Sequence, residues 1–450
     1  MSKPVFTHTQ DQLKQIAQDM LRFAREKGAS DAAVEISEGG GLSISVRKGK
    51  IETIEQNRDK GIGITVYIGQ RRGNASTSDF SERALRDSVD AAYNIARFTA
   101  EDDCAGLPDA DLLEMAPRDL KLCYPWLITA EEAIELAKRT EAAAFAVDKR
   151  ITNSEGASVH AQQSHFVAAN SRGFMGGYPV SRQTISVAPI AGRGAKMQRD
   201  DWYSSQRNAK KLAEPEAIGR YAAERALAKL NARKLDTRKC PVLFEAPLAA
   251  GLLGALVQAT SGGALYRKSS FLLDSLGTQI FPSHIQVQED PHVIGAVGSS
   301  PFDDEGVKTR KRNVVSDGVL QGYFLSTYSA RKLGMQTTGN AGGSHNLSLT
   351  SSLTKRTDNF VGMLKKMGTG LLVTELMGQG VNYVTGDYSR GASGYWVENG
   401  VIQYAVEEIT IAGNMREMFQ QIVAIGNDSL IRGTKQTGSI LIESMTVAGS

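Results

Sequence analysis

Cysteine is scarce in this sequence, and the few cysteines that exist lie far apart. Cys104, Cys123 and Cys240 are odd in number and form no closely spaced pair among 450 residues. Such a set excludes a disulfide-stapled secreted scaffold and the paired-thiolate zinc sites of small metal-binding domains. We therefore expect this protein to work in a reducing compartment, the cytoplasm.

An excess of charge of one sign is also missing, as are long apolar runs. Lysine and arginine number 52 against 49 acidic residues, a net charge of +3 that does not favour a nucleic-acid partner. The basic cluster Lys308–Arg312 is interpreted as a solvated edge strand. The first residues, MSKPVFTHTQ, contain no apolar signal core, and no apolar run reaches the ~20 residues that span a bilayer. We expect no membrane partner.

Glycine is abundant, with 45 residues against 12 prolines, and this ratio is typical of many tight turns. Helical periodicity after Thr9 changes to strand-like alternation over residues 33–68, and a second helix is predicted from Ser81. The same order then recurs, from a capping box at Thr129 through strand-like segments to a helix that begins at Pro215. An internal duplication and a common arrangement that arises twice both explain this recurrence.

The fold class predicted from these patterns is α+β with two domains. An N-terminal α+β domain of helix–meander–helix units is predicted over residues 1–235. After a basic and polar stretch, residues 236–450 alternate short apolar segments with glycine turns and contain few helical signals. This second part is predicted to be a β-rich domain with few helices.

Familiar catalytic signatures are absent. None of the six histidines is followed by glutamate, so there is no H-E-x-x-H helix, and neither a G-x-S-x-G elbow nor a complete phosphate loop occurs. His284 and His292 flank Glu289 and Asp290, and these four residues could supply metal ligands. Because signature ligand spacings are lacking, structural or surface roles for these histidines are favoured over a metal site.

The C-terminal half nevertheless contains stretches that are too specific to be generic. They are Tyr266–Asp274, Ser329–Gly334, Thr338–Gly343, Met377–Val381, Thr385–Gly400 and Ile409–Met415. These stretches are similar to the TldD/PmbA family of peptidases, once called modulators of DNA gyrase, and in particular to its PmbA (TldE) branch. Segments near the N-terminus, 31–47 and 61–78, match as well, so the resemblance covers nearly the whole chain.

The resemblance implies a cytoplasmic metallopeptidase assembled from two subunits. In this family a TldD-type and a PmbA-type subunit form a heterodimer that cleaves unfolded peptides, bound in extended form in a cavity between the subunits. The TldD subunit holds zinc through a histidine-glutamate helix, a second histidine and a cysteine near its C-terminus. We therefore expect a TldD-type sister subunit, extended peptide substrates, and a homodimer when this chain is alone.

This chain departs from the family's zinc pattern at each ligand. Leu253 and Gly254 stand about where the zinc subunit has histidine and glutamate, and Gln258 stands about where it has the second histidine. No cysteine follows Cys240. Since a catalytic zinc needs three protein ligands, we predict no catalytic residue, no metal site and no cofactor in this chain, and we expect the zinc in the TldD-type partner.

A second candidate site is the segment that contains Gly386, Asp387, Ser389, Arg390 and Gly391. Its glycines, charges and hydroxyl predict an ordered turn or loop of the β domain. Two interpretations of this segment stay open with equal weight: it contacts peptide, or Asp387 and Arg390 pair with each other and simply fix the turn.

Three functions therefore remain from sequence. The favoured one is a non-catalytic subunit of a TldD–TldE metallopeptidase complex. The second is a metallopeptidase that acts alone through an unrecognised site, and the third is a non-enzymatic regulator associated with gyrase or DNA.

Overall fold

The computed structural model describes residues 6–449 and divides into two compact units. The first unit comprises Met1–Leu227 together with Ile294–Thr309, and the second comprises Ala228–Val293 together with Arg310–Ser450. The boundary predicted at residue 235 lies close to the first division. Residues 294–309 belong to the N-terminal unit, although the sequence analysis assigned them to the C-terminal domain.

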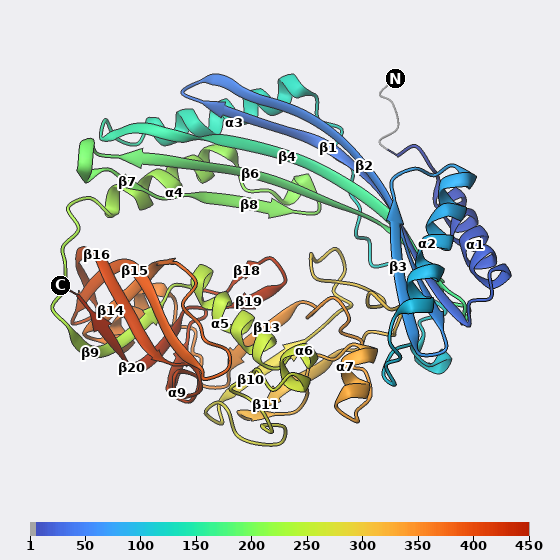
Figure 1. The fold of residues 1–450 in the computed structure, drawn as a ribbon. Helices are drawn as coiled ribbons and strands as arrows, with labels where there is room; N and C mark the ends of the chain where they lie inside the picture. Colours follow the sequence, from blue (N-terminus) through green and yellow to red (C-terminus); the bar gives the residue numbers. More distant parts are fainter. Residues whose placement is uncertain (1–5, 450) are drawn as a thin grey trace. The chain divides into compact units, whose positions relative to one another are not determined.

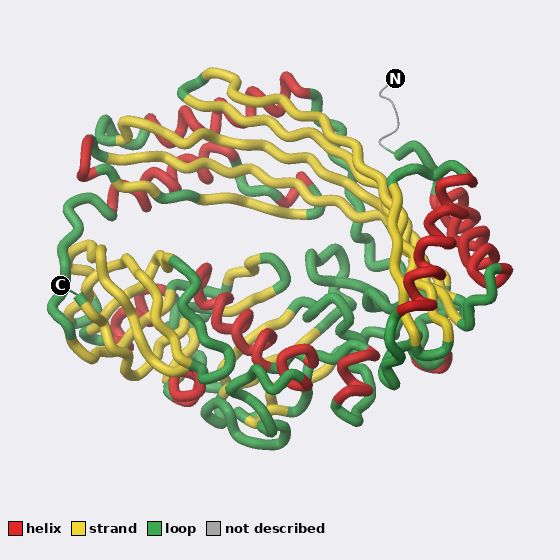
Figure 2. Tube along the Cα trace, viewed as in Figure 1, coloured by secondary structure: helices red, strands yellow, loops and turns green. Residues whose placement is uncertain are grey.

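The N-terminal unit is built on one large, curved antiparallel sheet (Figures 1 and 2). The strand order is β3-β2-β1-β4-β6-β7, and β5 and β8 pair with β4 and β6. The strands are β1 (Asp31–Arg47), β2 (Lys50–Ile68), β3 (Arg71–Thr77), β4 (Ile151–Asn170), β5 (Met175–Gly176), β6 (Pro179–Ala191), β7 (Gln198–Arg199) and β8 (Trp202–Gln206).

Four amphipathic helices cover one face of this sheet (Figure 1). Thr9 and Thr129 each form a capping box with the residue three positions later, which fixes the starts of α1 and α3. The helices are α1 (Gln10–Glu26), α2 (Glu82–Phe98), α3 (Ala130–Phe145) and α4 (Pro215–Ala228), and short 3₁₀ turns lie at η1 (Ala110–Leu112), η2 (Gly194–Lys196) and η3 (Ala209–Lys211).

Strand alternation assigns the two faces of the sheet. On β1, Val34 and Ile36 are buried under α1 and α2, whereas Ile44 and Val46 are buried with α3 and α4. The odd-numbered residues face the other way and are mostly small or polar. The strand-like alternation predicted from residue 33 is therefore confirmed for β1, which continues through the glycines at 39–41.

The helix–meander–helix order predicted twice is present twice. One set contains α1, β1–β3 and α2, and the other contains α3, β4, β6, β8 and α4. The two sets join where β1 pairs with β4. From this junction the strands of each set follow in chain order toward the edges of the sheet: β1, β2 and β3 on one side, and β4, β6 and then β7 or β8 on the other. The mixed α+β fold class is thus confirmed.

A buried carboxylate fixes residues 7 and 8 on this sheet. Glu38 accepts hydrogen bonds from the backbone N–H groups of Thr7 (2.7 Å) and His8 (3.0 Å), and His165 Nε2 lies 3.4 Å away. Burial acts to raise the pKa of Glu38, but these hydrogen bonds outweigh it and lower the pKa to about 2. An ionised glutamate therefore holds residues 7 and 8 on the sheet.

Aromatic packing explains why residues 294–309 belong to the N-terminal unit. The Phe302 ring lies 5.0 Å from Phe174 and 5.5 Å from Tyr178, measured between ring centroids. The guanidinium of Arg207 also donates to the carbonyl oxygens of Ala296 and Val297. These partners are more than 80 residues away in sequence, so no local pattern signals the return.

The C-terminal unit contains two six-stranded sheets, one of them closed. The open sheet has the order β12-β11-β10-β13-β19-β18; the other has the order β16-β15-β14-β9-β20-β17, and a further β16–β20 pairing closes it into a barrel. The strands are β9 (Arg238–Phe244), β10 (Ile285–Glu289), β11 (Arg312–Ser316), β12 (Val319–Leu320), β13 (Leu347–Ser351), β14 (Gly370–Met377), β15 (Asp387–Glu398), β16 (Val401–Asn414), β17 (Ile422–Ile425), β18 (Leu430–Arg432), β19 (Lys435–Thr437) and β20 (Ile440–Ala448).

Five helices accompany these sheets, so the prediction of a β-rich part with few helices is confirmed for the described residues. They are α5 (Ala246–Ala259), α6 (Gly262–Tyr266), α7 (Thr327–Lys332), α8 (Phe360–Met367) and α9 (Met415–Gln420). After α9 the chain turns directly into a strand, since residues 422–425 form β17. Across residues 6–449, none of the helices combines the length and the apolar character needed to cross a membrane.

Candidate functional site

The helix at the degenerate zinc position, α5, is almost entirely apolar. Leu253 has no exposed surface and lies in the main core of the C-terminal unit. Gly254 is half-buried and Gln258 is exposed. The three predicted positions therefore do not share a face. A side chain at 253 points into the core, whereas positions 254 and 258, four residues apart, lie on the same accessible side of the helix.

A lysine from a distant strand lies next to Gly254 on this accessible side. A Cβ atom added to Gly254 would lie 3.8 Å from Cε of Lys435, which belongs to β19. Partial burial lowers the pKa of Lys435. Within residues 6–449 its ammonium has no ion pair with a carboxylate. Sequence analysis missed Lys435, and no signal could have found it, because β19 reaches α5 only through its parallel pairing with β13.

These residues do not fit a zinc site of the kind that the resemblance gives to TldD. The exposed positions of α5 carry glycine and glutamine in place of histidine and glutamate. No three or more histidine, cysteine, aspartate or glutamate residues in the described part of the chain are grouped so that they could hold a metal ion. The Lys435 ammonium would, in addition, repel a divalent cation at this place.

The alternative ligand set from sequence is not brought together. His284 Nδ1 lies 2.8 Å from Ser351 Oγ, and its Nε2 lies 3.2 Å from the carbonyl oxygen of Ile422. Asp290 pairs with Lys311 at 3.0 Å and caps the backbone N–H of His292. Each of these side chains thus has a structural partner instead of a shared ligand position.

Glu289, the remaining member of that set, is the centre of a buried polar network. Its carboxylate accepts from Arg312 Nε (2.7 Å), from Asn340 Nδ2 (2.8 Å) and from the backbone N–H of His345 (2.8 Å). Burial alone would raise the pKa of Glu289, but the hydrogen bond from His345 and the charge of Arg312 outweigh burial and lower it. The network ties the loop 338–345 to β10 and β11.

This network corrects the expectation of a solvated basic edge over 308–312. The Arg312 side chain is 19% exposed, and β11 lies between β10 and β12 instead of at an open edge. Lys311 is paired with Asp290. Two of the cluster's charges are therefore neutralised within the chain.

The segment 386–391 begins at a turn and continues as a strand. Gly386 is buried with φ +85°, and a Cβ there would lie 3.1 Å from Asn414 Oδ1. From Asp387 onward the residues belong to β15, so the predicted loop is confined to the residues before it. Asp387 accepts from the Thr385 hydroxyl at 2.7 Å and does not pair with Arg390.

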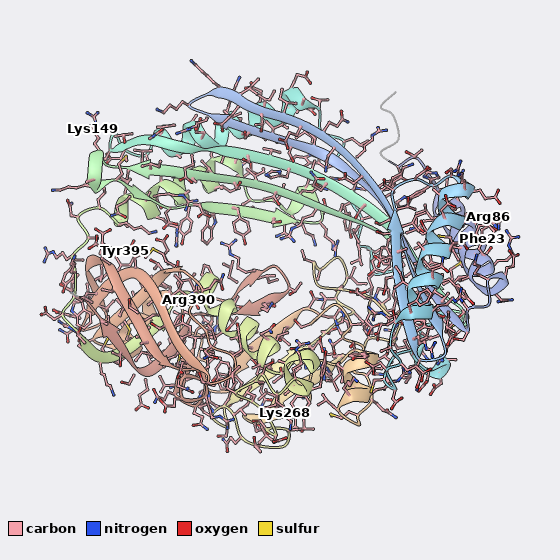
Figure 3. The ribbon with its side chains drawn as sticks, in the orientation of Figure 1. Phe23, Arg86, Lys149, Lys268, Arg390 and Tyr395 are labelled. Atoms are coloured by element: carbon pink, nitrogen blue, oxygen red, sulfur yellow. The ribbon has the colours of Figure 1, made fainter. Side chains whose placement is uncertain are left out.

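Arg390 is left without an acidic partner within residues 6–449. It comes from the same strand as Tyr395 (Figure 3). Its Nε and the hydroxyl of Tyr388 are both buried and have no hydrogen-bond partner in the described chain. Burial raises the pKa of Tyr388 to about 12, while the nearby charge of Arg390 acts in the opposite direction. The N–H groups of the guanidinium can therefore donate to a carboxylate or carbonyl oxygen of another molecule.

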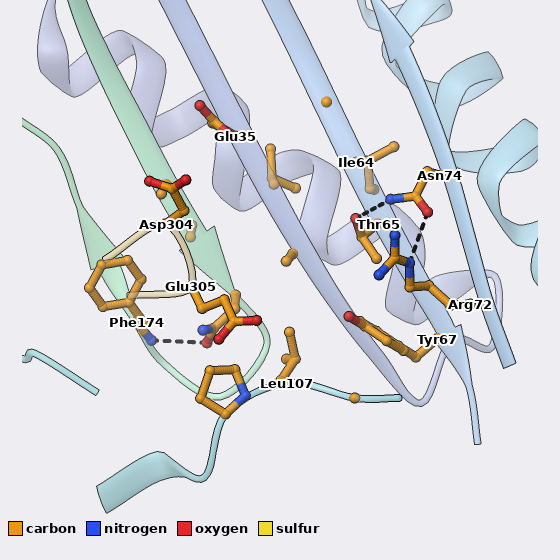
Figure 4. Close-up of a pocket in the computed structure, with 18 of the residues that line it drawn as sticks. Glu35, Ile64, Thr65, Tyr67, Arg72, Asn74, Leu107, Phe174, Asp304 and Glu305 are labelled. Atoms are coloured by element: carbon orange, nitrogen blue, oxygen red, sulfur yellow. Dashed lines mark hydrogen bonds between the residues drawn. The ribbon is translucent and has the colours of Figure 1, made fainter. Parts of the chain in front are cut away.

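A cavity of about 530 Å³ lies on the polar face of the N-terminal sheet (Figure 4). On one wall Arg72 donates to Asn74, which donates to the Thr65 hydroxyl at 2.6 Å. On the other side, Glu35 has a raised pKa, because it is partly buried and lies near the charge of Asp304. Sequence analysis did not identify this cavity, since its lining comes from strands and from the returning segment 294–309.

Comparison with known proteins places these features in a family. Models of the PmbA/TldA metallopeptidase domain 1, central domain and C-terminal domain match residues 32–96, 123–230 and 237–449. Together they cover most of the chain. The chain belongs to the PmbA/TldD metallopeptidase family. The resemblance drawn from the C-terminal motifs is confirmed.

Individual relatives extend this PmbA/TldD assignment over the full length. Metalloprotease PmbA of Escherichia coli O157:H7 is 47% identical over 439 residues, which are 97% of each chain. A structure from Bacteroides thetaiotaomicron, described as a proposed modulator of DNA gyrase, has a TM-score of 0.90 and 28% identity, and covers 97% of this chain and 99% of its own. TldE of Thermococcus kodakarensis shares the fold, with a TM-score of 0.84 at 20% identity, covering 96% of this chain and 100% of its own.

The buried network gives a stability prediction for this PmbA/TldD chain. Arg312→Met leaves the Glu289 carboxylate buried without its charge partner, so we expect the free energy of unfolding to fall by about 3–5 kcal/mol at pH 7. The pKa of Glu289 is lowered in the folded state, so the stability from its ionisation is present above its unfolded pKa and is lost as the pH falls through the folded value. The cost of Arg312→Met should therefore shrink at low pH, as measured by urea unfolding.

The exposed pair Arg139–Glu216, with Nε and Oε1 2.7 Å apart, provides the control. Arg139→Met removes a pair of similar length at the surface and should cost less than ~1 kcal/mol. An Arg312→Met cost that is equal at pH 4 and pH 7 would mean that packing, and not the ion pair, is what the arginine contributes.

Proposed function

We propose that this chain is the zinc-less PmbA/TldE-type subunit of a cytoplasmic TldD–TldE metallopeptidase complex that degrades or processes unfolded peptides. The observation that carries the proposal is α5, where Lys435 lies next to Gly254 and no zinc-ligand side chain is exposed. In this proposal a TldD-type sister subunit supplies the zinc, and this chain supplies surface that holds extended peptide near it.

The proposal also includes the cytoplasm as the compartment in which this chain works. Cys104, Cys123 and Cys240 are all free thiols, and the last is buried. Free thiols suit a reducing cytoplasm, where disulfides are rare. Burial raises the pKa of both Cys123 and Cys240, so neither thiol is activated as a nucleophile.

The rival functions have less support from the side chains. A peptidase that acts alone would need ligands, and His284 and Asp290 already have structural partners. A DNA-associated regulator would need a basic surface, but Arg312 and Lys311 of the one basic cluster are paired within the chain.

The proposal is tested by measuring peptidase activity of this chain alone, of a TldD-type sister alone and of the two mixed. We expect no cleavage of an unfolded peptide by this chain alone, and cleavage by the mixture that a chelator abolishes. Chelator-sensitive cleavage by this chain alone would contradict the proposal and favour the rival peptidase.

Arg390 is expected to contribute to the activity of the mixture. Its guanidinium lacks an acidic partner within residues 6–449, so Arg390→Ala removes a charge that can bind peptide or sister subunit. The loss of one charged hydrogen bond, about 1.5–3 kcal/mol, corresponds to a roughly 10–100-fold lower rate. Arg390→Lys should retain part of the activity.

The control for Arg390 is a measurement of folding. Because Arg390 makes no ion pair in the described chain, the unfolding midpoint of Arg390→Ala should stay close to that of the native chain. An unchanged peptidase rate with an unchanged midpoint would remove Arg390 from the site.

A further inference from the structure

One half of β2 forms an open edge of the N-terminal sheet. β2 pairs with β1 from Lys50 to Tyr67, whereas β3 pairs with β2 only from Ile62 to Ile68. No other strand in the described part of the chain pairs with β2. The outer side of residues 50–61 therefore presents backbone N–H and C=O groups that have no strand to bond to.

This edge is long and carries charges of both signs. Folded proteins shield such edges with prolines, bulges, very short strands or charged side chains, because an open edge is a template for pairing with another chain. Here the edge contains no proline, a single bulge near Glu52 and interspersed acidic and basic residues, so only a partner strand of complementary charge can pair with it. All of residues 51–60 are exposed, and among them Ile51 and Ile54 are 49% and 53% exposed.

We propose that this edge is the surface on which a second copy of the chain docks, forming one continuous antiparallel sheet across a two-fold axis. The inference rests on the proposed function only for its expectation that the chain alone forms a homodimer. A two-fold axis perpendicular to the sheet makes the two copies of the edge antiparallel and keeps the helices of both copies on the same face.

Ladder geometry limits the position of the axis. In an antiparallel pair, two opposed residues either both bond across the junction or both point back into their own sheets. Successive residues of a strand direct their N–H and C=O groups alternately outward and inward, so two residues that face each other must both be outward or both be inward. The sum of their residue numbers is then even, and the two-fold axis passes through a residue and not between two residues. β2 is in unbroken register with β1 from Thr53 to Tyr67, so this alternation is regular over most of the edge.

The bulge and the charges then select one register among those that pair at least three quarters of the edge. An axis through Ile54 brings the bulge residue Glu52 opposite Gln56, so that regular pairing extends over residues 53–55 alone. An axis through Glu55 places that residue opposite its own copy, and one through Asn57 places Glu55 opposite Asp59. Each of these last two opposes like charges, which destabilises a strand pair.

An axis through Gln56 avoids every such conflict. It places Thr53 opposite Asp59, Ile54 opposite Arg58 and Glu55 opposite Asn57. At each end Glu52 of one copy, at the bulge where the regular pairing stops, also comes next to Lys60 of the other. Within one chain Glu52 lies 4.0 Å from Arg47, and Lys60 lies 4.7 Å from the ring centroid of Phe80. Neither contact buries these charges. This self-complementarity favours a second copy over an extended peptide as the occupant of the edge.

A cysteine on the proposed axis tests the register directly. In this register Gln56 faces its own copy with Cβ atoms about 4.5–5.5 Å apart, so Gln56→Cys should form a disulfide-linked dimer on mild oxidation of the full chain. Glu55→Cys is the matched control, because position 55 is equally exposed but its two copies are diagonal neighbours, about 7–8 Å apart. The native chain, oxidised in the same way, shows how much cross-linking its own three cysteines give.

Each outcome of this experiment decides the proposal. Cross-linking of Gln56→Cys well above Glu55→Cys and the native chain is expected. No cross-link at 56, or a stronger one at 55, overturns the proposed axis whatever the peptidase assay shows. A cross-link to a TldD-type sister carrying its own edge cysteine, without any homodimer of Gln56→Cys, would overturn the second copy as the occupant.

Charge exchange provides an independent measurement. Lys60→Glu places two glutamates next to each other at both ends of the junction and should shift the chain toward monomer in sedimentation at micromolar concentration. The double variant Glu52→Lys with Lys60→Glu should restore the dimer. The two positions are about 27 Å apart along one strand, so restoration requires contact between copies. A native chain that stays monomeric throughout overturns the inference.

Discussion

The enclosure of α5 is the constraint on which the C-terminal unit and its function depend. The helix lies in a core shared by both sheets of the unit, with Val242 and Phe244 from the barrel and Ile285 and Val287 from the open sheet. Because most of its circumference is buried, most of its residues must be apolar. The narrow accessible side is then the only part that can carry chemistry, and here that side carries glycine and glutamine, next to a lysine from β19.

This constraint separates what the sequence could predict from what it could not. Helix starts were predictable because Thr9 and Thr129 make local capping boxes, and the wet face of β1 was predictable because alternation is local. The absence of zinc ligands on α5 could also be read directly from the residues. The proximity of Lys435 to Gly254 could not, since it depends on pairing between strands that are far apart in sequence.

The same limit applies to charged residues elsewhere. Arg312 sits in a run of basic residues, a pattern that indicates solvent exposure, yet Glu289 from the neighbouring strand holds it in the interior. Asp387 and Arg390 are three apart, which on a turn permits an ion pair. On a strand this spacing places them on opposite faces. Long-range strand pairing thus decided which charges are neutralised and which, like that of Arg390, lack an acidic partner within residues 6–449.

Zinc content decides whether this PmbA/TldD chain contributes surface and not a metal to peptide cleavage. The purified full chain is passed over a gel-filtration column in buffer with micromolar zinc, dialysed, and subjected to elemental analysis, with a TldD-type sister treated in parallel. We expect far less than one zinc per chain here and about one in the sister. About one tightly held zinc in this chain would mean that the chain has a metal site of its own and is not a zinc-less subunit.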